Sequence, residues 1–187
     1  MLLLASASPR RLQLMADAGY HCEVQPVDVD ERQTPGETAE AYVGRIARLK
    51  AATARERFPG RVIVAADTAV VVDGDVFGKP LDAADAARML ERLSGRAHEV
   101  LTGVAVCGAT LVSCVERTVV WVNALEPAEI AAYIATGEPM DKAGAYAIQG
   151  LASRFIPRIE GSYSNVVGLP IATVAAALRR AQASGDG

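Results

Sequence analysis

The chain has 187 residues, of which 51% are hydrophobic and 5% aromatic, and a formal net charge of −3. A chain of this length can bury a core without disulfides, so we expect one compact domain over residues 1–183 with a central cleft, followed by a frayed tail over residues 184–187. The three cysteines form no Cys-x-x-Cys pair. This argues against a disulfide scaffold or a zinc site and for reduced thiols in the cytoplasm.

Several partner classes are disfavoured by the same composition. No apolar run approaches the roughly 18 residues of a membrane span, so we expect a soluble protein with no membrane partner. The apolar residues 1–4 lack a basic lead-in, which argues against a signal peptide. Weak acidity without a block of like charges argues against nucleic acid as a partner. With only two histidines, a histidine-rich metal site is excluded.

In chain order, the pattern predicts a strand over residues 2–5, a helix over 9–18, a strand over 21–24, a helix over 38–57, a strand over 61–66, a hairpin over 70–77, a helix over 82–93, strands over 98–107 and 111–122, a helix over 127–136, a strand over 155–159 and a helix over 170–183. Residues 26–37, 140–150 and 161–168 are expected to form loops. The alternation of helices and strands, with long antiparallel pairs, predicts an α/β fold with a mixed, twisted sheet flanked by helices.

The strand-to-helix turn at residues 6–11 reads Ser-x-Ser-Pro-Arg-Arg and is the first candidate site. Amide groups and the dipole at a helix N-terminus attract anions, and arginine donates paired hydrogen bonds to phosphate. Arginine is otherwise disfavoured at this end of a helix. The turn is therefore either a phosphate site built on Ser8, Arg10 and Arg11 or an ordinary capped helix with solvated arginines.

Two charged residues stand out because of where the predicted elements place them. Lys50 falls four residues after Ile46 on the apolar stripe of its helix, where it either has a functional role or extends its ammonium group past the core. Asp67 follows a predicted strand, and open α/β sheets bind ligands at the carboxyl ends of their strands. Alternatively, Asp67 and Thr68 form a structural turn.

Two later segments carry polar residues among turn-forming ones. Lys79 lies between Gly78 and Pro80 just after the predicted hairpin, either as a site residue or in a plain surface turn. Residues 140–150 are rich in glycine yet include Gln149, whose amide suits the edge of a nucleobase. A flexible connector is the alternative interpretation of that segment.

Together these segments resemble the Maf family over nearly the whole chain. The matching blocks occur in the family's order at residues 3–11, 66–68, 78–80, 138–150 and 161–170. Members of the family resemble inosine triphosphate pyrophosphatases in fold and cleave nucleoside triphosphates to the monophosphate and pyrophosphate. The resemblance therefore implies this fold and this hydrolase activity.

Within the family, the subgroup that acts on dTTP and UTP is the one this sequence is most similar to. Arg10, Thr68 and Gln149 match that subgroup, and the resemblance implies that they set substrate specificity. The sister subgroup acts on 7-methylguanosine triphosphate and tends to have glutamine after the aspartate. The expected substrates are therefore dTTP and UTP, together with modified pyrimidine triphosphates from the family's housekeeping role.

The resemblance also implies roles for the charged residues. Asp67 would be the proton acceptor, and Lys50 and Lys79 would face the phosphates with Arg10 and Arg11. Glu31 matches an acidic loop position and would hold a divalent cation with Asp67; carboxylate and phosphate oxygens favour Mg²⁺ or Mn²⁺. Water would then attack the α-phosphorus with the help of the metal.

The rival interpretation is a non-catalytic nucleotide-binding regulator of septum formation and cell division, because the family has also been linked to those processes. A binding protein needs the phosphate pocket but not the carboxylates. Glu31, Lys50, Asp67 and Lys79 are all present, which favours the enzyme. The resemblance is also compatible with a homodimer, the state of many family members.

Overall fold

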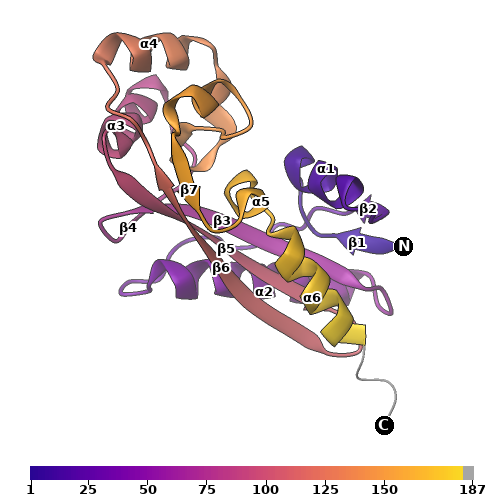
Figure 1. Cartoon of the computed structure of the whole chain (residues 1–187). Coiled ribbons are helices and arrows are strands. Elements are labelled where there is room, and N and C mark those ends of the chain that lie inside the picture. The colour runs from indigo at the N-terminus through magenta and orange to yellow at the C-terminus, as the bar shows by residue number, and fades with distance from the viewer. Residues whose placement is uncertain (183–187) are drawn as a thin grey trace. The chain divides into compact units, whose positions relative to one another are not determined.

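The computed structural model describes residues 1–182 (Figure 1). Its helices are α1 (Pro9–Asp17), α2 (Ala39–Arg57), α3 (Ala83–Leu93), α4 (Pro127–Ala135), α5 (Tyr163–Val167) and α6 (Ile171–Gln182). Its strands are β1 (Leu2–Leu4), β2 (Cys22–Val24), β3 (Ile63–Val72), β4 (Asp75–Phe77), β5 (Ala97–Cys107), β6 (Leu111–Trp121) and β7 (Arg158–Glu160). Three short 3₁₀ turns are η1 (Glu138–Asp141), η2 (Ala143–Ala145) and η3 (Leu151–Phe155). The tail expected over residues 184–187 lies outside the described residues.

The strands form one seven-stranded sheet in the order β2-β1-β3-β5-β6-β7, with β4 paired to β3. β1 runs parallel to β2 and β3, whereas β4 and β7 run antiparallel to β3 and β6. Parallel and antiparallel pairs in one sheet confirm the predicted mixed α/β fold with flanking helices. Within residues 1–182, no helix has the length and apolarity needed to cross a membrane.

The chain divides into two compact units. The first contains Met1–Thr68, Thr102–Glu116 and the described residues from Gly168 onward, and the second contains Ala69–Leu101 and Arg117–Val167. β3, β5 and β6 contribute residues to both units. The single domain with a cleft expected over residues 1–183 stays a prediction.

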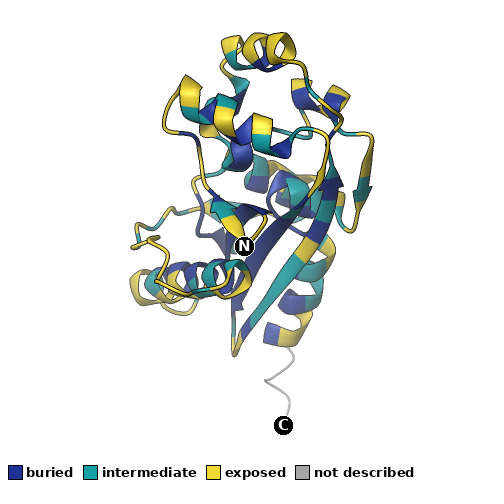
Figure 2. Cartoon of the chain, turned by 90° about the vertical axis from the view of Figure 1, so that its left-hand side faces the viewer, coloured by how far each residue is buried: buried dark blue, intermediate teal, exposed yellow. Residues whose placement is uncertain are grey.

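In the first unit, two helical layers pack on opposite faces of the strands. Successive strand residues point to opposite faces. Val64 and Ala66 of β3 pack in a cluster with residues of α1 and α6, whereas Ile63 and Ala65 pack in a cluster with residues of α2. Figure 2 shows the same pattern as buried strand residues and helices that are buried on one side only. The alternation directs Asp67 toward the α2 side and Thr68 toward the α1 side.

The approach of α2 to the strands depends on one glycine. A Cβ atom at Gly103 of β5 would lie 2.1 Å from the carbonyl oxygen of Val43 on α2. Backbone cannot yield at that distance, so only glycine permits this packing. Lys50 lies on the same helix and is buried with its apolar neighbours.

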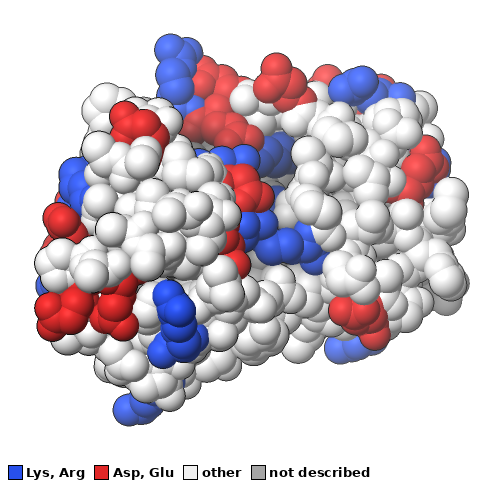
Figure 3. Space-filling model, turned by 90° about the horizontal axis from the view of Figure 1, so that it is seen from above, with Lys and Arg blue, Asp and Glu red and all other residues white. Residues whose placement is uncertain are grey.

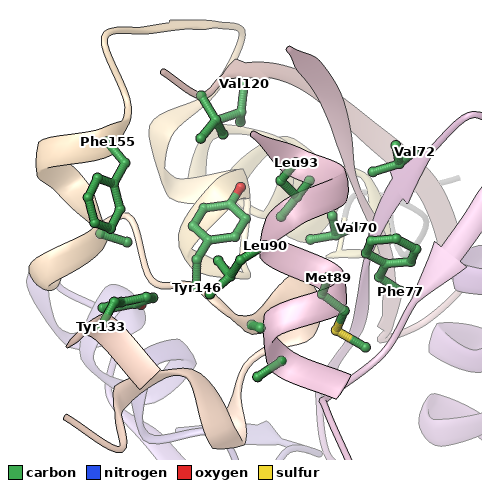
Figure 4. Packing of buried hydrophobic residues seen from close by; sticks show 14 of the residues in the cluster. Val70, Val72, Phe77, Met89, Leu90, Leu93, Val120, Tyr133, Tyr146 and Phe155 are labelled. Carbon is green, nitrogen blue, oxygen red and sulfur yellow. The ribbon is translucent and has the colours of Figure 1, made fainter. Parts of the chain in front are cut away.

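The second unit has its own core, which packs α3, α4 and the 3₁₀ turns against residues of β3, β5 and β6 (Figure 4). Tyr133 of α4 is fully buried there and meets Phe155 edge to face, with ring centroids 5.7 Å apart. Tyr146 packs in the same cluster. The core therefore orders residues 138–155, which carry little periodic signal of their own.

Acid is expected to destabilise the second unit through His98. Burial lowers the pKa of His98 to about 4, from an ordinary 6.5. Its Nε2 lies 2.7 Å from the Tyr146 hydroxyl oxygen, and its Nδ1 has no partner among residues 1–182. Below the ordinary value the unfolded chain takes up a proton that folded His98 does not, so stability falls as the pH drops from 6.5 toward 4.

We expect the free energy of unfolding to be lower by up to roughly 3 kcal/mol at pH 4 because of His98. To measure this loss, the wild type and His98→Gln are unfolded in urea between about pH 7 and about pH 4.5, and the pH dependences of their unfolding free energies are compared. The exposed His21→Gln serves as the matched control. Equal slopes for the wild type and His98→Gln would contradict the assignment.

The end of one predicted strand was wrong. The expected strand over residues 61–66 does not end before Asp67; β3 continues to Val72. The residues after Thr68 are Ala-Val-Val-Val, which favour an extended, buried strand. Asp67 therefore lies inside a strand, held by partners that the local sequence does not contain.

Two predictions near the C-terminus were also wrong. Phe155 ends η3 rather than beginning a strand, and β7 covers only Arg158–Glu160. The expected loop over residues 161–168 contains α5. Ser162 caps this helix by accepting a hydrogen bond from the Asn165 amide at 3.2 Å. A five-residue helix is too short to show a period, so the pattern missed it.

Other local predictions were confirmed. The hairpin joins β3 to β4 through Asp73 and Gly74, both with positive φ. All three cysteines are free thiols; Cys107 is buried, whereas Cys22 and Cys114 are half-buried.

Candidate functional site

The first unit carries most of the predicted site residues, and each comes from an element already described. The α1 turn supplies Ser8, Arg10 and Arg11; the loop over residues 26–37 supplies Glu31; α2 supplies Lys50; and β3 supplies Asp67 and Thr68. Lys79 and Gln149 belong to the second unit. On the face drawn in Figure 3, basic and acidic side chains are interspersed.

Lys50 joins two carboxylates. Its Nζ lies 2.8 Å from Oδ1 of Asp67 and 2.7 Å from Oε1 of Glu31. Lys50 and Asp67 are both buried, whereas Glu31 is exposed. The sequence left open whether Lys50 has a functional role or extends its ammonium group past the core. In the structure the ammonium group stays inside the protein, paired with the two carboxylates.

The environment of Asp67 favours proton uptake. Burial raises the pKa of this carboxyl above its ordinary 3.8, and the nearby positive charges of Lys50 and Arg11 only partly oppose that shift. A carboxylate with a raised pKa accepts a proton more readily than an ordinary one, which suits a general base.

Glu31 and Asp67 also suit a divalent cation. Both carboxylates converge on one positively charged nitrogen. Among the described residues, no group of three or more histidine, cysteine or acidic side chains could hold a metal ion. Mg²⁺ commonly binds through one or two carboxylates, with phosphate and water supplying its other oxygens. The donor set therefore fits a metal that arrives with a phosphorylated ligand.

Arg11 is buried, and every nitrogen of its guanidinium donates to a protein acceptor. Nε donates to the carbonyl oxygen of Gly168 at 2.8 Å, and Nη2 to the Thr68 hydroxyl at 3.0 Å. Nη1 donates to the carbonyl oxygen of Ala66 at 2.7 Å and to Ser6 Oγ at 3.2 Å. These bonds tie the α1 turn to β3 and to Gly168, the residue that follows α5. A direct phosphate contact of Arg11 stays a prediction.

The Thr68 hydroxyl is saturated within the first unit. It accepts from Arg11, contacts the Thr102 hydroxyl at 2.9 Å and lies 3.2 Å from the carbonyl oxygen of Gly168. A hydroxyl has one donor and two acceptor positions, and these three contacts use all of them. Thr68 is therefore locked in place by the protein, and its base contact stays a prediction.

Ser8 caps α1 by its backbone alone. Its main chain is extended, and its hydroxyl makes no bond to the helix amides. Its own amide donates to Ser6 Oγ at 3.2 Å, so the buried Ser6 orders the turn. Arg10 is half-buried beside it. The Ser8 hydroxyl therefore stays available to a ligand at the start of the helix.

In the second unit, Lys79 and Gln149 are exposed, and neither makes a side-chain hydrogen bond or ion pair within residues 1–182. Their segments are joined by a backbone hydrogen bond from the Gly144 amide to the Gly78 carbonyl oxygen at 3.0 Å. Gly144 has a φ of +70°, and a Cβ there would lie 2.8 Å from the Val70 side chain. Glycine is therefore required at this contact.

The chain is similar to known proteins over most of its length. The family model described as Maf-like protein matches residues 1–181. The chain belongs to the Maf family. It is 54% identical over 186 residues to a dTTP/UTP pyrophosphatase of Anaeromyxobacter sp. (strain Fw109-5), covering 96% of this chain and 89% of that protein. It is 53% identical over 182 residues to a dTTP/UTP pyrophosphatase of Geotalea uraniireducens (strain Rf4), covering 96% and 94%.

The fold of this Maf chain is also found among solved structures. The Ham1 protein of Staphylococcus aureus superposes with a TM-score of 0.51 at 16% identity, covering 96% of this chain and 98% of that one. At this identity the likeness shows the fold alone. It confirms the architecture that the resemblance implied.

Sequence reasoning missed the residue that anchors the acidic loop of the Maf chain. Arg45 on α2 donates through Nε to Glu37 Oε1 at 2.7 Å and through Nη2 to the Arg32 carbonyl oxygen at 3.0 Å. The bond to Arg32 holds the backbone immediately after Glu31. The only signal was its basic side chain on a helix that carries several others, which by itself indicates no partner.

Proposed function

We propose that this Maf chain hydrolyses dTTP and UTP to the monophosphate and pyrophosphate. The observation that carries the proposal is a buried aspartate with a raised pKa, paired with a buried lysine. The names of relatives at 53 to 54% identity over nearly the whole chain support the same activity. Those relatives are hydrolases of a phosphoric anhydride, and the site described above has the charges that such a reaction needs.

Asp67 is proposed to accept the proton of the attacking water. Removing this proton as the oxygen approaches the α-phosphorus makes the water a stronger nucleophile. Lys50 holds one oxygen of the carboxylate, and the other oxygen is proposed to take the proton of the water. The ion pair thus orients the base without removing its capacity to take a proton.

The triphosphate carries about four negative charges, and cationic groups hold the charge that grows on the leaving pyrophosphate. Ser8 and Arg10 at the α1 N-terminus are proposed to bind phosphate oxygens, because the Ser8 hydroxyl makes no bond to the helix amides and the start of a helix attracts anions. Lys79 is proposed to bind another phosphate, since its ammonium group has no protein partner within residues 1–182. Arg11 fixes the turn that carries Ser8 and Arg10.

A divalent cation, Mg²⁺ or Mn²⁺, is proposed to be held by Glu31 and Asp67 together with phosphate oxygens. When bound, such an ion polarises the phosphoryl group and neutralises its charge. The two carboxylates are far apart in sequence. Lys50 pairs with both of them, and Arg45 holds the backbone that follows Glu31.

Base selection is proposed to rest on Gln149. Its exposed amide has both a donor and an acceptor, which match the O4 and N3 edge of uracil or thymine. Cytosine reverses this pattern, with an amino donor in place of O4 and an N3 acceptor in place of N3–H, so the amide orientation that suits uracil or thymine does not suit cytosine. Thr68 and Arg10 are proposed to contribute by the shape of the turn that positions the phosphates, because the Thr68 hydroxyl is already saturated. Modified uridine triphosphates that keep this edge are expected to be accepted.

A panel of nucleoside triphosphates tests the proposal. The protein is incubated with UTP, dTTP, CTP, ATP, GTP or 7-methylguanosine triphosphate, each with Mg²⁺, with Mn²⁺ or with chelator, and released pyrophosphate and monophosphate are measured. We expect UTP and dTTP to exceed the other substrates by roughly tenfold or more in kcat/KM, the effect of one polar group left unpaired. Preference for a purine would overturn the base assignment. Absence of pyrophosphate from every triphosphate with either metal would favour a binding role.

A further inference from the structure

Gln149 lies in a turn whose two ends are both anchored to one pair of side chains, those of the buried Tyr133 and the half-buried Glu138. The turn itself is closed by a hydrogen bond from the Gly150 amide to the Ala147 carbonyl oxygen at 3.0 Å. Such a turn fixes the course of the backbone but not its placement against the rest of the unit. The placement comes from bonds to residues outside the turn.

Those bonds lie two residues before and two residues after Gln149. The Ala147 amide donates to the Tyr133 hydroxyl oxygen at 3.3 Å. The Leu151 amide donates to Glu138 Oε2 at 3.0 Å. The Tyr133 hydroxyl in turn donates to Glu138 Oε1 at 2.8 Å, which closes the chain of hydrogen bonds across the pair.

Tyr133 and Glu138 are themselves held in place by packing and by hydrogen bonds. Tyr133 is fully buried in the core of the second unit and packs edge to face on Phe155 (Figure 4). Partial burial alone would raise the pKa of Glu138, but the Leu151 amide, the Tyr133 hydroxyl and the Ala152 amide lower it overall. The carboxylate is therefore held ionised, with both oxygens engaged as acceptors.

Gly150 shows how closely the turn rests on this carboxylate. A Cβ atom at Gly150 would lie 2.3 Å from Glu138 Oε2, closer than any side chain permits. The absence of a side chain at this position lets the backbone rest directly on Glu138. The residue that follows Gln149 is thus matched to the carboxylate in shape as well as in hydrogen bonding.

We infer that Tyr133 and Glu138 are positioning residues for base selection, which act by holding the 147–151 turn so that the Gln149 amide meets the pyrimidine edge. This inference rests on the proposed function of Gln149. Neither side chain needs to touch the substrate. Misplacement of a recognition group by about 1 Å is enough to lose a large part of its effect.

Two conservative substitutions test the inference. Tyr133→Phe keeps the buried ring and removes the bridging hydroxyl, whereas Glu138→Gln keeps the shape but replaces one acceptor oxygen by a donor. Their kcat/KM values for UTP and CTP are compared with those of the wild type. We expect the UTP-to-CTP ratio to fall about tenfold in each variant, through a higher KM for UTP, with kcat changed less than about threefold.

Tyr20→Phe and Glu126→Gln are the matched controls, and melting midpoints monitor the fold. A double-mutant cycle then isolates the route: in the Gln149→Ala background, Tyr133→Phe is expected to change the ratio by less than about twofold. Equal losses for UTP and CTP, or a full further loss in the Gln149→Ala background, would overturn the inference. If the wild type itself does not discriminate UTP from CTP, the proposed role of Gln149 fails instead.

Discussion

Replacement of Asp67 by asparagine is expected to lower the turnover of UTP by at least about 10²-fold. Asparagine has the shape of aspartate but cannot take the proton of the attacking water. It also removes one of the two negative charges that Lys50 bridges. The measurement is pyrophosphate release under saturating UTP and metal, which reports kcat rather than binding.

The fold of Asp67→Asn is checked by circular dichroism and by its melting midpoint. Asp28→Asn is the matched control, because Asp28 is an exposed carboxylate in the same acidic loop as Glu31. Turnover of Asp67→Asn within a factor of about three of the wild type would rule out Asp67 as the proton acceptor.

Replacement of Arg11 by methionine is expected to destabilise the protein by at least about 3 kcal/mol. The substitution removes one donor from each of the carbonyl oxygens of Ala66 and Gly168 and from each of the hydroxyls of Ser6 and Thr68. Arg11→Lys is expected to recover only part of this loss, because an ammonium group cannot reproduce a planar fork of donors. Urea unfolding at neutral pH measures the change.

The exposed Arg48→Met provides the control, with an expected change within about 0.5 kcal/mol. The same experiment separates the two roles of Arg11. If Arg11 only bound phosphate, Arg11→Met would retain the stability of the wild type and show a raised KM for UTP. Loss of stability in the absence of nucleotide supports the structural bonds.

Elements with a clear cap or period were predictable from the sequence. Thr38 caps α2 by accepting from the Ala41 amide at 3.2 Å, and Asp82 caps α3 by accepting from the Asp85 amide at 2.8 Å. Both helices were placed correctly because the signals lie within one turn of chain. The same holds for the Asp73-Gly74 hairpin.

The contacts between the site residues were harder to predict from the sequence. The apolar stripe of α2 placed Lys50 on the inner face, but nothing near it in sequence indicated that Glu31 would reach it from a loop. Asp67 was singled out for its position after buried β-branched residues, and the strand in fact continues past it. The different environments of the adjacent Arg10 and Arg11 show most clearly what the sequence could not predict.

In the sequence, Arg10 and Arg11 look equivalent. One pattern could have indicated that Arg11 is buried: it precedes the buried Met15 by four residues and therefore shares its face of α1. Two of the four acceptors that make this burial favourable are backbone carbonyl groups, which leave no trace in residue type. Composition and period can place a side chain on a face, but they cannot show which distant main-chain atoms it will meet.

The bond between Arg11 and Gly168 also orders events during synthesis. The two residues are 157 positions apart, and Thr68 is 100 positions from the same carbonyl oxygen. A nascent chain exposes Arg11 early, yet it cannot supply the acceptor for Nε until Gly168 has left the ribosome. The turn at residues 6–11 therefore reaches its final form only after Gly168 has emerged, and a chain that stops before Gly168 retains a guanidinium group with an unmet donor.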